Sequence, residues 1–105
     1  MRAHSIVVES FDDKLIREAH KEARVIFGDA CSCITNPQTN GRTAFFVAPD
    51  GSKEGWQESD DGNKRRERFV ELLESMKHED GSSSINYIEV MFGDDEEEAE
   101  IVNHN

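Results

Sequence analysis

The sequence predicts an α+β fold, in which two amphipathic helices pack against one antiparallel sheet of four strands. Three observations lead to this prediction. Short runs of β-branched and aromatic residues alternate as half-buried strands do, two longer segments repeat apolar residues at helical spacing, and turn-forming residues separate them. The length of 105 residues suits one domain. We expect a single folded domain over residues 1–93 and a disordered acidic tail over residues 94–105.

The first strand and the first helix are predicted from the N-terminal part of the chain. An apolar, β-branched run at residues 5–9 predicts a strand. Residues 11–27 repeat apolar side chains at helical spacing, after a Ser-x-x-acid capping pattern that begins at Ser10. Gly28 follows where a left-handed C-terminal cap belongs, so the helix is expected to end there.

A hairpin is predicted next. Residues 30–35 and 43–48 have strand character and flank Asn40-Gly41, the strongest short signal for a two-residue β-turn because both residue types tolerate a positive φ. The polar stretch 49–62 is predicted to be a loop, and it contains the single tryptophan, Trp56.

A second helix and a fourth strand complete the predicted domain. Apolar residues recur at helical spacing within residues 63–78, and residues 85–92 alternate as a strand does. Beyond Gly93 there is no periodicity and no Lys or Arg. The acidic residues of this tail are Asp94, Asp95, Glu96, Glu97, Glu98 and Glu100. Because such a composition buries too little apolar surface to offset chain entropy, the tail is predicted to be mobile.

The order strand, helix, strand, strand, helix, strand resembles that of split-βαβ, or ferredoxin-like, domains. The resemblance implies that right-handed crossovers place both helices on one face of the sheet and leave the other face open. It implies no activity, because this fold hosts many unrelated functions.

Strand alternation assigns side chains to the two faces. With a two-residue turn at Asn40-Gly41, Ile34 pairs with Val47 and Thr35 with Phe46. The residues expected under the helices are Ile34, Phe45, Val47, Ile88, Val90 and Phe92. The residues expected on the open face are Val7, Cys31, Cys33, Ala44, Phe46, Tyr87 and Met91. A longer loop would turn the side chains of residues 30–35 to the opposite faces of the sheet, which would remove the cysteines from the open face.

The charge balance disfavours several classes of partner. Twelve basic against 23 acidic residues give a net charge of -11, which repels nucleic acid and anionic lipid. The predicted order is also similar to that of RNA-recognition motifs, but residues 42–47 keep only a few features of their third-strand signature. We expect no direct binding of nucleic acid or membrane. The first nine residues are too polar for a signal peptide or membrane span, which predicts a cytoplasmic protein.

The two cysteines are the strongest candidates for metal binding or catalysis. Cys31 and Cys33 could supply two ligands, but structural zinc needs four. The histidines are His4, His20, His78 and His104, on separate elements. A disulfide between the cysteines would close a strained ring, so free thiols are expected. No phosphate-binding or hydrolase motif occurs. The sequence predicts no cofactor, metal or catalytic residue, and it disfavours enzymatic activity without excluding it.

Four basic residues cluster in the first turns of the predicted second helix, where positive charge opposes the helix dipole. They are Lys64, Arg65, Arg66 and Arg68. Compensation is expected from Asp60 and Asp61 or from the tail, in preference to a foreign phosphate or acidic partner.

A small, acidic, non-catalytic interaction or regulatory module is the function that these observations favour. An open sheet face with an apolar patch marks a contact surface, and the partner expected is a protein, most simply a second copy in a homodimer. The predicted partner-binding residues are Val7, Phe46, Tyr87, Met91 and Trp56, although Trp56 could instead be a lid on the sheet.

Two other functions fit the sequence. The acidic surface could mimic nucleic acid and inhibit a DNA- or RNA-binding protein. Alternatively, a small-molecule or metal-dependent enzyme could place its site at a dimer interface.

Overall fold

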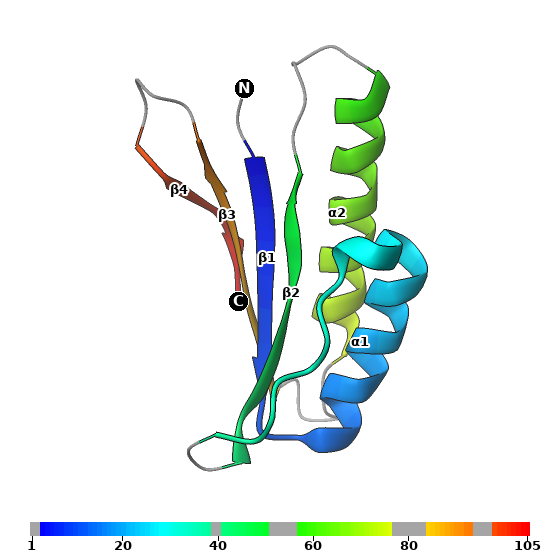
Figure 1. Cartoon of the computed structure of the whole chain (residues 1–105), viewed down its shortest axis with the longest axis vertical. Coiled ribbons are helices and arrows are strands. Elements are labelled where there is room, and N and C mark those ends of the chain that lie inside the picture. Colours follow the sequence, from blue (N-terminus) through cyan, green and yellow to red (C-terminus); the bar gives the residue numbers. More distant parts are fainter. Residues whose placement is uncertain (1–2, 39–40, 51–56, 77–83, 94–97) are drawn as a thin grey trace.

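The computed structural model describes residues 3–38, 41–50, 57–76, 84–93 and 98–105. Within these ranges the chain forms a four-stranded antiparallel sheet with both long helices on one side (Figure 1). The elements are β1 (Ala3–Ser10), α1 (Asp13–Phe27), the short 3-10 helix η1 (Gly28–Ala30), β2 (Thr43–Asp50), α2 (Gln57–Ser75), β3 (Ile85–Phe92) and β4 (Glu100–His104). The predicted α+β class, with one antiparallel sheet and two helices, is confirmed. Neither helix is both long and apolar enough to cross a bilayer, within the residues described.

The strands lie in the order β2-β1-β3-β4, and each neighbouring pair is antiparallel. Val7 in the middle of β1 pairs with Phe46 of β2 on one side and with Ile88 of β3 on the other. Ile88 in turn pairs with His104 of β4. These four residues form a row that crosses the whole sheet.

The segment that follows η1 runs along the outer side of β2 without forming a regular strand. The backbone N–H groups of Ser32 and Thr35 donate to the carbonyls of Phe46 and Ala44, both at 2.8 Å. In return, the side-chain hydroxyls of Ser32 and Thr35 accept from the N–H groups of Phe46 and Ala44. Side chains here take the place of backbone carbonyls, so the prediction of a strand over residues 30–35 is wrong in this respect.

The register of this segment also differs from the predicted one. Cys31 bridges Val47, the position expected for Ile34. The N–H of Gln38 donates to the carbonyl of Arg42, so the connection is longer than a two-residue turn. The side chain of Cys31 therefore points to the face expected from a longer loop, so Cys31 is buried in the core instead of lying on the open face.

Three boundaries differ from the predictions. Asp12 caps α1 by accepting from the N–H of Leu15, because Ser10 ends β1 and is itself buried. Helix α2 begins at Gln57, so the predicted loop is helical in its last part. The predicted lack of regular structure beyond Gly93 is wrong for Glu100–His104, which form β4. Trp56, His78 and residues 94–97 lie outside the described part of the chain.

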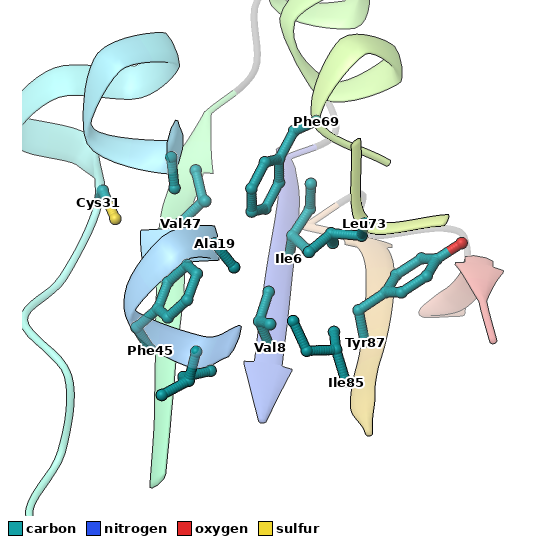
Figure 2. Close-up of a cluster of buried hydrophobic side chains, with 12 residues drawn as sticks. Ile6, Val8, Ala19, Cys31, Phe45, Val47, Phe69, Leu73, Ile85 and Tyr87 are labelled. Carbon is teal, nitrogen blue, oxygen red and sulfur yellow. The ribbon is translucent and has the colours of Figure 1, made fainter. Parts of the chain in front are cut away.

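The core lies between the sheet and the two helices (Figure 2). Strands β1 and β2 supply Ile6, Val8, Phe45 and Val47, while the helices supply Ile16, Ala19, Ala23, Phe69 and Leu73. The aromatic rings of Phe45 and Phe69 stand 6.3 Å apart, which joins β2 to α2. The predicted burial of Phe45 and Val47 is confirmed.

Adjacent phenylalanines of β2 give a direct test of this layer arrangement, because Phe45 is 1% exposed and Phe46 is 48% exposed. Phe45→Ala should lower the free energy of unfolding by about 3–5 kcal/mol, since it empties a packed site. Phe46→Ala, the matched control in dilute protein, should cost only about 0.5 kcal/mol. Urea denaturation followed by circular dichroism measures both, and similar losses would contradict the assignment of faces.

Candidate interaction surface

Both long helices lie on one side of the sheet, so its other face is open (Figure 1), and this open face carries large exposed apolar side chains. Val7 is 41% exposed and its cross-strand neighbour Phe46 is 48% exposed. Ile101 of β4 is also exposed, and Ile88 of β3 is half-buried between them. The predicted position of Val7 and Phe46 on the open face is confirmed, whereas Ile88 and Ile101 were not predicted there.

A groove of about 360 Å³ lies beside this row of apolar side chains. Its lining includes Val7, Glu9, Asn86, Ile88, Ile101 and His104, which come from β1, β3 and β4. The groove is open to solvent along the sheet surface, and its aliphatic walls suit an apolar side chain better than a charged group.

Glu9 is the acid that lines this groove, and it is already paired. Arg42 donates to both of its carboxylate oxygens at 2.7 Å, and the amide of Asn86 donates to Oε1 at 2.6 Å. Burial alone would raise the pKa of the Glu9 carboxyl, but the hydrogen bonds from Arg42 and Asn86 outweigh burial and lower it. Glu9 therefore stays ionised with its charge compensated within the chain.

Two predicted partner-binding residues of β3 lie on the other side of the sheet. Tyr87 is buried under α2, and its hydroxyl donates to a carboxylate oxygen of Glu74 at 2.5 Å. Met91 lies on the same side as Tyr87, by strand alternation, and is half-buried. The predicted faces of β3 are therefore reversed, and Ile88, Val90 and Phe92 belong to the open face.

A buried polar cluster accounts for this reversal. Glu89 is 5% exposed and points under the helices, where His4 Nδ1 lies 3.0 Å and Arg66 Nε lies 3.9 Å from its Oε2. The amide of Asn103 on β4 donates to Glu89 Oε1 at 3.3 Å, and Arg66 also donates to the side-chain carbonyl of Asn63. These partners compensate the Glu89 carboxylate on the helix side of the sheet, where burial without them would be costly.

The sequence contains a signal for this cluster that apolar periodicity alone does not reveal. Arg66 precedes Phe69 by three residues and Leu73 by seven, so helical spacing places it in the buried stripe of α2. A buried Arg requires an acidic partner from another element. Glu89, the acid within the apolar strand β3, is that partner.

The other basic residues of α2 do not have the predicted setting. Lys64, Arg65 and Arg68 are exposed. Because α2 begins at Gln57, they lie beyond the first turn, where the effect of the helix dipole has largely faded. Of the predicted tail acids, Glu98 and Glu100 are exposed and the rest fall outside the described residues.

The cysteines occupy different environments. Both are free thiols, with Cys31 buried and Cys33 exposed. Burial raises the pKa of the Cys31 thiol, although Arg24 opposes this shift, and a protonated thiol is a poor nucleophile. The ring of His20 lies 2.8 Å from the carbonyl of Ser32. Across the described ranges, His, Cys, Asp and Glu side chains form no group of three or more suited to a metal ion.

Comparison with known proteins found no protein family, no curated protein and no solved structure that matches this chain.

The polar cluster predicts a large difference between two neighbouring arginines. Arg66→Leu should destabilise the protein by roughly 3–5 kcal/mol, because it leaves the Glu89 carboxylate buried without its guanidinium. Arg65→Leu, at an exposed position, should change stability by about 0.5 kcal/mol or less. Adding Glu89→Leu to Arg66→Leu should recover part of the loss, since no buried carboxylate then lacks its guanidinium. Urea denaturation measures the free energy of unfolding of each variant. If the losses of the two single substitutions simply add in the double variant, the pairing of Arg66 with Glu89 is contradicted.

The single tyrosine gives a specific optical test. Burial, the hydrogen bond to Glu74 and the negative charges of Glu74 and Glu89 together raise the pKa of Tyr87 to about 12. Its absorbance titration should therefore have a midpoint near 12 instead of the usual value of about 10. Because the folded state holds the proton more tightly, this contribution to stability is complete below about pH 10 and is lost as pH rises toward 12.

Glu74→Gln is the matching control for this titration. It removes one negative charge beside the hydroxyl and should lower the midpoint while the protein remains folded. A wild-type midpoint near 10 in folded protein would show that Tyr87 is exposed, as the sequence had predicted, and would reverse the faces of β3.

Proposed function

We propose that this protein is a non-catalytic interaction module that acts through the open face of its sheet, with two copies packed face to face in a homodimer. The observation that carries this proposal is the exposed pair of apolar neighbours Phe46 and Val7, next to a groove on the same face. Contiguous exposed apolar surface of this kind marks a contact site in soluble proteins.

The two edges of the sheet are less suited to association than its face. The outer edge of β2 is covered by residues 31–35, whose hydroxyls satisfy its N–H groups. At the other edge, the pairing of β3 with β4 shifts register between Glu89 and Val90, and β4 exposes Glu100. Irregular pairing and charge are the features that discourage edge-to-edge contact.

Electrostatics also favours a partner with the same surface. Glu9 is compensated by Arg42, so the row and groove present no uncompensated acid despite the chain's net charge of -11. A neutral, apolar face is complementary to another neutral, apolar face, whereas a strongly basic partner would find no complementary negative charge on it. Two sheets can pack in this way at about 10 Å.

We further propose that the fold follows the split-βαβ order, with β4 as an addition. Support comes from the position of residues 31–35 along β2. If this segment counts as the second strand of the unit, the order across the sheet is residues 31–35, β2, β1 and β3, which is the order of that unit.

A charge substitution on the open face tests the proposed dimer. Phe46→Glu should weaken self-association by roughly 100-fold or more, because two like charges would be brought into the interface. Val25→Glu is the matched control, since Val25 is also apolar and exposed but lies on α1, on the helix side of the sheet. Sedimentation velocity measures the association, and circular dichroism checks that each variant is folded.

The outcome can go against the proposal in two ways. A wild-type protein that stays monomeric at high concentration would show that the open face does not serve self-association. Equal weakening by Phe46→Glu and Val25→Glu would indicate a dimer that forms through another surface or through general charge effects.

A further inference from the structure

Phe46 and the groove lie in line with each other across the sheet. Phe46 pairs with Val7, Val7 with Ile88, and Ile88 with His104, so the four side chains form one transverse row. Neighbouring strands are about 4.8 Å apart. An exposed aromatic ring therefore stands at one end of the row, and the groove lies toward the other end, lined by Val7, Ile88 and His104.

This arrangement is complementary to itself under a two-fold rotation. An axis parallel to the strands, placed over the row between Val7 and Ile88, exchanges the β2 end of one copy with the β3–β4 end of the other. The strand axes of the two stacked sheets are then nearly parallel, which is the usual geometry of face-to-face packing. The same surface serves both copies, as a closed two-fold interface requires.

We infer that Phe46 of each copy fills the groove of the other copy. The inference rests on the proposed function, because it specifies how two open faces meet. The groove, at about 360 Å³, is near the lower end of the range for ligand pockets, about 300–1,000 Å³, and is open on one side. It therefore has room for an aromatic side chain that enters from the open side, and an aromatic anchor in a partner's pocket is the usual form of an interface hot spot.

The charges around the groove permit this occupant. The Glu9 carboxylate already accepts hydrogen bonds from Arg42 and Asn86. A phenyl ring that covers this carboxylate therefore leaves neither of its oxygens without a partner. His104 and Ile101 offer a ring and an aliphatic wall on β4, and aromatic rings pack well against both.

A complementation experiment tests this packing directly. Phe46→Ala removes the aromatic anchor but keeps the groove, whereas Ile88→Trp fills the groove but keeps the anchor. Each variant alone should dimerise roughly 30-fold or more weakly than wild type, the change expected for loss of a hot-spot aromatic. A mixture of the two should form a heterodimer, because one intact anchor meets one intact groove and the filled groove meets the alanine.

Native mass spectrometry distinguishes the heterodimer from both homodimers by mass, and sedimentation velocity gives the affinities. Preferential heterodimer formation supports the inference. If wild type dimerises and Phe46→Ala weakens it, but the mixture is no stronger than the separate variants, the inference fails while the face-to-face dimer stands. If wild type is monomeric, the proposed function and the inference fail together.

A second groove-filling variant guards against misfolding of the first. Ile101→Trp adds bulk to the same groove from the exposed strand β4 and disturbs no core residue. It should also complement Phe46→Ala. Failure of two folded groove variants to do so would overturn the inference.

Discussion

The pairing of the buried Glu89 carboxylate with Arg66 and His4 is the interaction on which the arrangement of the sheet depends. A carboxylate in the core is tolerated only with partners, because its desolvation otherwise costs several kcal/mol. Side chains on a strand alternate, so the direction of one residue sets the direction of all the others. With Glu89 held under α2, the neighbouring Ile88 and Val90 must face away from the helices.

This constraint explains why β3 contributes apolar side chains to the open face. Burial of hydrophobic surface alone would place Ile88, Val90 and Phe92 in the core and leave Glu89 in water. The protein does the reverse, and so carries a charged pair inside and aliphatic side chains outside. Departures from the local rule are common where a surface has another role, and contact with a second open face would return the exposed side chains to an apolar environment. The buried charged pair and the proposed interface thus both follow from which way the side chains of β3 face.

The same cluster helps to form the groove. Asn103 of β4 reaches Glu89, while Asn105 donates to the carbonyl of Ile85 and accepts from the N–H of Tyr87. These amide contacts tie β4 to β3, although the side chains of β4 are exposed along its whole length. Because β4 supplies one wall of the groove, the surface that would receive a partner's side chain depends on polar contacts made beside it.

Local patterns in the chain were enough to predict the α+β class, the 85–92 strand, the C-terminal end of α1 at Gly28, and the placement of Val7 and Phe46 on the open face. Each of these follows from periodicity or a capping residue within one segment. Long-range contacts decided the rest. Both sets of alternating side chains on β3 are largely apolar, so alternation alone does not determine which set faces the helices. The contact of Glu89 with Arg66, on a different element, determines it. Likewise, β4 has no apolar period of its own, and it became a strand because β3 offered it a free edge and backbone partners.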